Sequence, residues 1–328
     1  INNNSVLTSL MNADVIRPLD DLVAKHGQSL KPSQLIKIDG KVMSVAFMAN
    51  AQHLVYRADV LKKIGVNPPK TYEEMLAAAK MIRDKGIMEN PVGGAYAAGW
   101  NLATEFINMY LGHGGEFYKA GTAELTINND KGVATLKMMK ALSEYMNPDF
   151  LTHDSNATNA EFRAGNVALM NMWGSRAATL VSVDGVPQEV KDGFAIDGPM
   201  TVGGGNTNAT TLWWDGFAIA KNISDSEAEA SFISLVHAIR PEMLNDETSL
   251  QAVWLIDGYK PTPAAKGVFA AASSTSLPYP SLPQQPLLHS ALGNELADFM
   301  QGKETAEQAL KDITAAYTGA AKEKGLLN

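Results

Sequence analysis

Hydrophobic residues recur at helical spacing in three segments of the chain, and each segment opens on a capping box. In such a box, a Ser or Thr side chain and a Glu or Gln three residues later each bond a backbone N–H of the first turn. The three boxes pair Thr71 with Glu74, Ser224 with Glu227 and Thr305 with Gln308. We therefore predict amphipathic helices over residues 71–82, 224–239 and 305–317, each covering an apolar surface.

Short β-rich runs alternate with these helices. They lie at residues 42–47, 54–56, 167–170 and 217–220. This alternation is typical of α/β architecture, in which helices cover the faces of sheets. The Pro-rich segment 277–286 (LPYPSLPQQP) interrupts the pattern, and we expect it to run extended, over the surface or along a cleft, before a helix that begins near Leu288.

Composition narrows the class of protein. With 328 residues, of which 45% are hydrophobic and 19% charged, the chain can divide into two domains with buried cores. A net charge of −8 without a Lys/Arg cluster excludes a nucleic-acid footprint. The apolar runs are too short to span a membrane. The six histidines have no metal-ligand spacing, residues 203–205 (GGG) lack the ending of a phosphate loop, and there is no cysteine. We predict no metal site and no cofactor.

The segment 39–75 places two strands on either side of a bend. The strand 42–47 follows a turn at Gly40, and the strand 54–56 comes after the small polar stretch 49–52 (ANAQ). A chain that leaves one strand, bends through small residues and enters another is a candidate hinge.

This segment, DGKVMSVAFMANAQHLVYRADVLKKIGVNPPKTYEEM, resembles the "GK...P...N...L.YN.D.....G...PP.TW.E" run of family 1 extracellular solute-binding proteins of ABC importers, the group that includes the maltose-binding protein. Further matches follow in the same order. Residues 162–170 (FRAGNVALM) with Trp173 are similar to "F..GKAAM...G.W", residues 213–221 (WWDGFAIAK) to "GG.gLAI.K", Pro263 to the "g..P" loop, and 304–317 to the terminal helix.

The start of the chain falls inside another family element. Residues 12–22 (NADVIRPLDDL) match "aG.i.PLDDL", which in the family follows strand-and-helix units. We therefore expect the first units of lobe one to be missing here, and the natural polypeptide to be longer at its N-terminus.

The resemblance implies a two-lobe α/β fold, the type II periplasmic-binding-protein fold. Lobe one, in part, would hold residues 1–48 and 215–265, and lobe two 49–214 and 266–328, with hinge crossovers near 48–51, 212–216 and 264–274. It also implies a monomer that captures a carbohydrate and delivers it to ABC transporter permease subunits. The location would be the periplasm, or the outer surface of a Gram-positive cell through a lipid anchor.

A sugar presents apolar faces and a rim of hydroxyls, so its receptor needs flat aromatic rings and fixed polar groups. Candidate platforms are Trp100, Trp173, Trp213 and Trp214; candidate hydroxyl partners are Asn50, Gln52, Asn101, Glu105, Arg176 and Asp215. Each Trp is equally a candidate core residue. Neighbours in a strand face opposite sides, so only one of Trp213 and Trp214 can face a cleft. Asp215 could instead cap a turn with Gly216, and Arg176 could hold an acidic substituent.

Two other functions fit part of this pattern. Glu105 and Asp215 could be the carboxylate pair of a glycosidase, and a polyamine receptor would also use aromatic and acidic residues. The non-catalytic receptor is favoured because the matched motifs are architectural and none of them places a nucleophile or a general acid.

Overall fold

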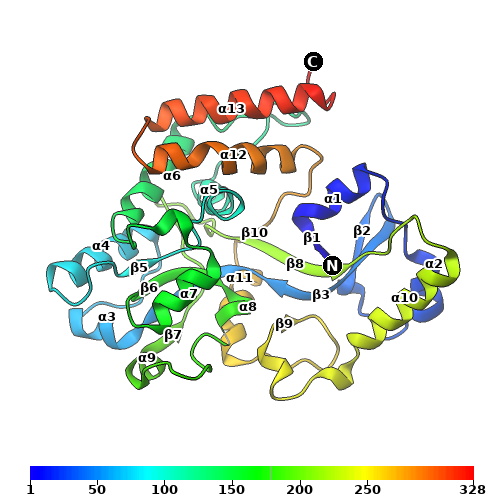
Figure 1. Cartoon of the computed structure of the whole chain (residues 1–328), viewed down its shortest axis with the longest axis horizontal. Helices are drawn as coiled ribbons and strands as arrows, with labels where there is room; N and C mark the ends of the chain where they lie inside the picture. The colour runs from blue at the N-terminus through cyan, green and yellow to red at the C-terminus, as the bar shows by residue number, and fades with distance from the viewer. Residues whose placement is uncertain (178) are drawn as a thin grey trace.

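Two β-sheets lie side by side, each covered by helices, in the computed structural model, which describes residues 1–177 and 179–328 (Figure 1). The six-stranded sheet has the order β1 (Asn2–Asn3), β8 (Thr211–Phe217), β3 (Lys41–Asn50), β2 (Leu35–Ile38), with β9 (Val253–Trp254) on β3 and β10 (Leu277–Pro278) on β8. The four-stranded sheet has the order β5 (Val92–Gly93), β6 (Leu169–Trp173), β4 (Gln52–Arg57), β7 (Phe194–Ile196).

The helices divide between the two sheets. With the six-stranded sheet go α1 (Asn4–Asn12), α2 (Asp20–His26) and α10 (Asp225–Ala238). Around the four-stranded sheet lie α3 (Ala58–Ile64), α4 (Tyr72–Asp84), α5 (Trp100–Gly112), α6 (Asp130–Ser143), α7 (Ser155–Arg163), α8 (Gly174–Ala177), α9 (Gln188–Gly193) and α11 (Lys266–Ala272). Beyond them, α12 (Gln285–Met300) packs on α5, and α13 (Ala306–Glu323) packs on α6 and α12. Within the described residues, every helix is too short or too polar to cross a membrane.

The three predicted capped helices are α4, α10 and α13. The side chains of Thr71, Ser224 and Thr305 each accept a hydrogen bond from the backbone N–H three residues on. The box is reciprocal only at Ser224, whose own backbone N–H donates to Glu227. At Thr71 the carboxylate of Glu74 accepts from the backbone of Lys70 instead, because the Lys70 N–H lies within reach. The helices are confirmed, and two of the three predicted boxes are only half formed.

Three boundaries differ from the sequence prediction for local reasons. The strand predicted at 167–170 begins two residues later, because Gly165 takes φ +83° and turns the chain just before it. Of the strand predicted at 217–220, only Phe217 lies in β8, and beyond it Ala220 forms a single bridge with Ile16. Helix α12 begins at Gln285 rather than near Leu288, because Pro286 fits a first turn, where no backbone N–H donor is needed.

Each sheet has its own apolar core. On the six-stranded sheet, Val45, Phe217 and Phe232 of α10 are buried together. On the four-stranded sheet, Leu54 and Leu169 belong to a larger core that extends through α5 to α12 and α13. This separation of cores is the physical basis of a molecule with two lobes.

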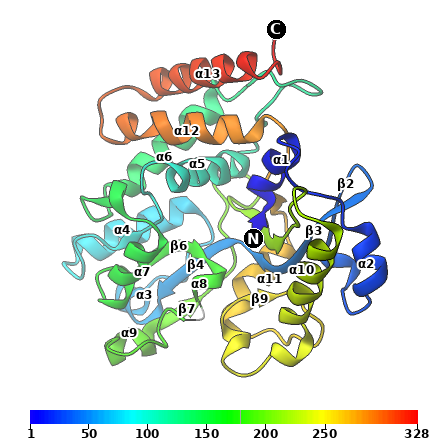
Figure 2. The ribbon, with the colours of Figure 1, turned by 45° about the vertical axis from the view of Figure 1, so that its right-hand side comes forward.

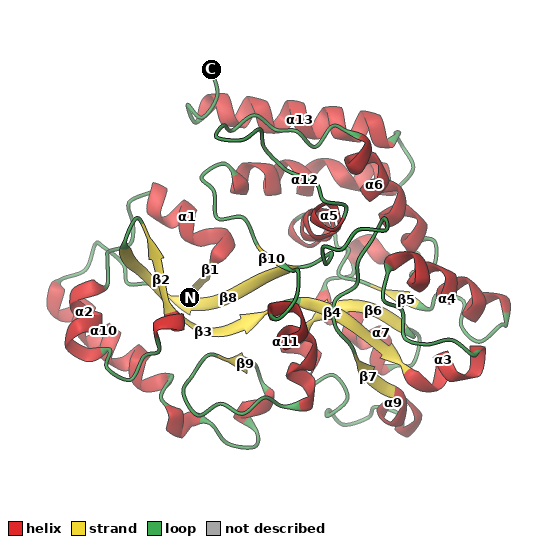
Figure 3. Ribbon diagram, turned by 180° about the vertical axis from the view of Figure 1, so that it is seen from behind, coloured by secondary structure: helices red, strands yellow, loops and turns green. Residues whose placement is uncertain are grey.

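The chain first passes between the sheets where β3 leads into β4 (Figure 3), and only the buried Ala51 lies between these strands. Asn50, the last residue of β3, pairs with Trp213, while Gln52, the first residue of β4, pairs with Trp173 of the other sheet. The chain returns to the six-stranded sheet between β7 and β8, and a later passage lies between β9, which pairs with β3, and α11, which packs on β4. The segment predicted as the second crossover, 212–216, lies inside β8, and the one predicted as the third, 264–274, is largely helical. The proposed lobe boundaries stay a prediction.

Candidate functional site

Five aromatic side chains from separate segments meet where the two sheets join. The ring centroid of Trp100 lies 6.4 Å from that of Trp173, 5.6 Å from Trp213 and 5.1 Å from His289, on which it stacks at 28°. Tyr279, just after β10, lies 4.3 Å from Trp213. Three of the four predicted tryptophans are thus brought into one cluster.

Exposure distinguishes the members of this cluster. Trp100 is 44% exposed, whereas Trp173, Trp213 and Tyr279 are at most 9% exposed. Trp100 owes its position to Gly99, whose φ of +96° allows the chain to turn into the start of α5. Because buried rings support it from behind, Trp100 presents a rigid apolar face to solvent.

A cavity of about 330 Å³ opens beside Trp100, between α1 of one half and the α5 and α12 helices of the other. Figure 2 shows α1 beside the near end of α12. The cavity is lined by Ser5, Val6, Ser9, Gly99, Trp100, Tyr279, Pro286, His289, Ser290, Gly293 and Asn294. Of these described residues, none carries a carboxylate, an amine or a guanidinium group. The lining combines aromatic faces with hydroxyl and amide groups.

His289 holds the cavity wall in one arrangement. Burial lowers its pKa to about 4, so the ring is neutral at pH 7. Its Nε2 lies 3.0 Å from the Trp100 carbonyl and must donate to it, while Nδ1, 2.8 Å from the Tyr279 hydroxyl, accepts from that phenol. One tautomer of His289 therefore fixes both Trp100 and Tyr279.

Gln52 and Glu105, predicted as ligand contacts, instead lie beneath the cluster. Both are almost fully buried, and the Gln52 Nε2 donates to Glu105 Oε1 over 2.6 Å. Burial raises the pKa of Glu105 to about 7, against hydrogen bonds from Gln52 and Asn171 that lower it. These two side chains satisfy each other, and neither lines the cavity.

The remaining predicted polar contacts are dispersed. The Asn50 side chain makes two hydrogen bonds with Ser175: Nδ2 donates to the hydroxyl over 3.0 Å, and Oδ1 accepts from the backbone N–H over 3.1 Å. Asn101 is half-buried on α5 and Arg176 is exposed on α8. None of them lines the cavity.

Trp214 and Asp215 belong to the six-stranded sheet. Trp214 packs against the buried Met43 on the face of β8 opposite to Trp213, as strand alternation requires. Asp215 pairs with Asn3 of β1, and burial raises its pKa, opposed by a hydrogen bond with Asn3. Because Asp215 and Gly216 both lie inside β8, the reading of Asp215 as a turn cap is wrong.

Sequence reasoning missed Tyr279, His289 and the serines of the cavity. Tyr279 lies in the Pro-rich segment expected along a cleft, which was the one available signal. His289 follows in α12, where nothing in the periodicity marks it.

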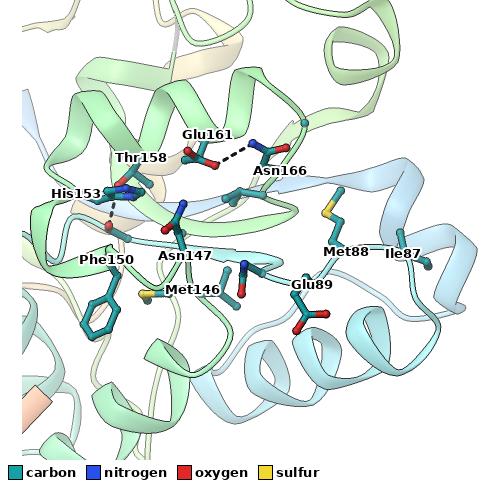
Figure 4. A pocket seen from close by; sticks show the side chains of 16 residues that line it. Ile87, Met88, Glu89, Met146, Asn147, Phe150, His153, Thr158, Glu161 and Asn166 are labelled. Atoms are coloured by element: carbon teal, nitrogen blue, oxygen red, sulfur yellow. Dashed lines mark hydrogen bonds between the residues drawn. The ribbon is translucent and has the colours of Figure 1, made fainter. Parts of the chain in front are cut away.

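A second cavity of about 330 Å³ lies in the four-stranded half, against β5 and α7 (Figure 4). Its polar groups include Glu89, His153 and Glu161, and the Glu161 carboxylate accepts from Asn166 over 3.0 Å. It lacks the tryptophan platform, so it fits a sugar less well. Within residues 1–177 and 179–328, no group of three or more acidic or histidine side chains could hold a metal ion.

Comparison with known proteins then fixes the family. The model of the bacterial extracellular solute-binding proteins matches residues 1–236. The chain belongs to this family. A probable ABC transporter-binding protein of Deinococcus radiodurans is 30% identical over 192 residues, which is 56% of this chain and 44% of that protein. A probable sugar-binding periplasmic protein of Rhizobium meliloti is 28% identical over 166 residues, 47% of this chain and 39% of that protein. The matches span less than half of either relative.

Solved structures of solute-binding proteins share the fold. A maltose-bound MalE3 of T. maritima has a TM-score of 0.81 at 19% identity, covering 97% of this chain and 83% of its own. A solute-binding protein from Agrobacterium radiobacter K84 in complex with ribitol has a TM-score of 0.83 at the same identity and coverage. One from Agrobacterium vitis S4 with bound D-mannitol has 0.79 at 18% identity, covering 99% of this chain and 84% of its own. The two-lobe fold expected from the sequence is confirmed.

Proposed function

We propose that this family member is a non-catalytic receptor that captures a neutral carbohydrate or polyol between its two lobes and delivers it to an ABC transporter permease. The exposed ring of Trp100, held over a cavity shared by elements of both halves, carries this proposal. A flat apolar ring beside hydroxyl and amide groups suits the C–H face and hydroxyl rim of a sugar.

The charge of the cavity decides between ligand classes. A polyamine needs carboxylates around its amines, and an acidic sugar needs a cation, yet the described lining residues carry neither. Arg176, the predicted partner for an acidic substituent, is exposed on α8 and away from the cavity. Neutral hydroxylated compounds are therefore the preferred ligands.

A glycosidase is the less favoured alternative. Its general acid must reach the glycosidic oxygen, but the Glu105 side chain is 2% exposed and already accepts from Gln52. Asp215 lies in β8, where it pairs with Asn3 of the neighbouring edge strand β1. Chromatography of an oligosaccharide after long incubation should recover it intact. Turnover that Glu105→Gln abolishes would instead establish an enzyme.

Binding should close the two lobes. The passage from β3 to β4 is a single residue, and Ala51 and its neighbours can absorb a change of dihedral angles. Since α1 approaches the cavity from one half and α12 from the other, a closed form gains ligand contacts that an open form lacks. Small-angle scattering should show a smaller radius of gyration with ligand, and an unchanged radius at saturation would contradict closure.

The setting follows from the family. We propose that it works as a monomer in the periplasm, or outside the cell on a lipid anchor, where it meets the permease. Co-purification of the ligand-loaded protein with permease subunits is the direct measurement.

Trp100→Ala tests the site itself. Calorimetry with ribitol, D-mannitol and maltose would identify a ligand, and the variant should bind it about tenfold or more weakly because the platform is gone. Phe269→Ala is the matched control, since Phe269 is 41% exposed on α11 and does not line the cavity. Equal affinities for Trp100→Ala and the wild type would refute the assignment.

A further inference from the structure

A single chain of buried hydrogen bonds connects the aromatic cluster to Glu105. The Trp213 Nε1–H donates to Thr211 Oγ1 over 2.7 Å, and the Thr211 hydroxyl donates to Asn108 Oδ1 over 2.6 Å. The Asn108 amide donates to Gln52 Oε1 over 2.7 Å, and Gln52 Nε2 donates to Glu105 Oε1 over 2.6 Å. All four bonds run in the same direction, from the indole to the carboxylate.

The carboxylate is what determines this direction. An ionised Glu105 can only accept, so the Gln52 amide must turn its NH₂ group toward it and its oxygen away. That oxygen then accepts from Asn108 and, over 3.0 Å, from Asn171. The Asn108 oxygen is left to accept from Thr211, whose oxygen in turn accepts from the indole. Such chains polarise one another, and a charged end strengthens them.

This chain of hydrogen bonds also connects the two sheets, because it includes the first residue of a strand in each. Gln52 is the first residue of β4, directly after the passage at Ala51, and Thr211 is the first residue of β8. The neighbouring Thr210 hydroxyl donates to the Gln52 backbone oxygen over 2.9 Å. Glu105 and Asn108 lie three residues apart on one face of α5, the helix that begins at Trp100.

We propose that Glu105 is a positioning residue for the ligand site: acting through Gln52, Asn108 and Thr211, its carboxylate holds the Trp213 indole in the orientation on which the platform of Trp100 depends. This inference rests on the proposed receptor function. Trp213 lies edge-on to both Trp100 and Trp173, at 62° and 86°, so a rotation of its ring would displace both neighbours.

The surroundings of Glu105 make this device sensitive to pH near neutrality. Its pKa is about 7, and among the described residues no charged side chain contributes to that value. The titratable groups that sense Glu105 are the phenols of Tyr72 and Tyr96, whose pKa values are raised mainly by burial, so both stay neutral. Protonated Glu105 is a poorer acceptor for Gln52, and the direction of the chain is then less strongly fixed.

The indole N–H of Trp213 provides a direct readout without any ligand. Its ¹H–¹⁵N resonance, assigned from its loss in Trp213→Phe, should titrate with a midpoint near pH 7 in the wild type. In Glu105→Gln, whose amide oxygen can still accept from Gln52, the resonance should stay constant between pH 6 and 8. Glu144→Gln, an exposed site at the end of α6, should behave as the wild type. A Trp213 resonance that ignores pH, or that titrates equally in Glu105→Gln, would overturn the proposal.

Binding completes the test with ribitol, D-mannitol or maltose as probe. Glu105→Ala, which leaves the Gln52 NH₂ without an acceptor, should weaken affinity about tenfold at pH 8. Glu105→Gln should restore most of this loss, with an affinity independent of pH. If none of the probes binds, the proposed function is in question, while the resonance experiment still decides the role of Glu105.

Discussion

Replacing His53 with Asn should change how the stability of this protein depends on pH. His53, in β4, is fully buried; its Nδ1 lies 3.2 Å from the Leu54 carbonyl, and its Nε2 has no partner among the described residues. Gly174 and Gly267 lie directly against the ring. A Cβ added at Gly174 would lie 3.1 Å from it, and one added at Gly267 would lie 2.2 Å from it. Burial therefore lowers the pKa of His53 to about 4.

The sign follows from comparing the folded and unfolded states. Below its ordinary pKa of 6.5 the unfolded histidine binds a proton, whereas the folded one remains neutral down to about pH 4. Proton binding thus stabilises the unfolded state as the pH falls, and the folded protein loses stability between about pH 6.5 and 4. From pH 7 to pH 5 the loss is about 2 kcal/mol for His53, and about the same for His289, whose pKa is also about 4.

Glu105 acts in the opposite direction. Its pKa is raised from 4.5 to about 7, so the folded state binds the proton first and stability rises by about 2 kcal/mol as the pH falls from 7 to 5. The contributions of these three groups sum to a net loss of about 2 kcal/mol from pH 7 to pH 5. Burial also lowers the pKa of His113, which adds to the loss. His53→Asn removes one histidine contribution, so its loss should be about 2 kcal/mol smaller than that of the wild type.

Urea unfolding followed by circular dichroism at pH 7 and pH 5 measures this difference. Asn keeps a donor near the Leu54 carbonyl but fills less space, so the variant should be less stable at both pH values. The quantity tested is therefore the change between them. If the wild type and His53→Asn lose the same free energy on acidification, the buried ring does not titrate as argued.

Two further predictions concern the six-stranded half. Phe232→Ala should cost about 3–5 kcal/mol of unfolding free energy, because Phe232 is fully buried against Phe217. Its neighbour Ile233 is 46% exposed, so Ile233→Ala should change the unfolding free energy by only about 0.5 kcal/mol. Similar losses for the two variants in urea unfolding would contradict the burial of Phe232. Gly216→Ala should cost about 2 kcal/mol or more, since its Cβ would lie 2.5 Å from the Val45 carbonyl oxygen, and a variant as stable as the wild type would show that β3 and β8 separate easily.

Local chemistry was sufficient to predict the framework of this protein. The caps at Thr71, Ser224 and Thr305 act within four residues, so they can be recognised without knowledge of the fold. The passage at Ala51 was also recognisable, because small polar residues interrupt two apolar strands.

The site depended on contacts that no local pattern encodes. Alternation predicted that Trp213 and Trp214 face opposite sides, but which side is the cleft depends on the pairing of β8 with strands from the start of the chain. Gln52 and Glu105 have the chemistry of ligand contacts, yet α5 lies against β4, and each becomes the other's partner. Tyr279 and His289 are hydrogen-bonded to each other across the beginning of α12, and this contact places both in the aromatic cluster.

The central position of β8 in the six-stranded sheet has a consequence for biosynthesis. Asn4, at the beginning of the chain, donates to the Leu212 carbonyl, which follows it by 208 residues. At roughly 5–20 residues per second, a ribosome adds that length in about 10–40 s. Until then β3 has β2 on one side only, and its unpaired edge carries the apolar Val45 and Ala46. The four-stranded half, whose strands fall between residues 52 and 196, can complete its sheet first. The half that supplies α1 to the cavity is thus the one most exposed to aggregation while the chain is being made.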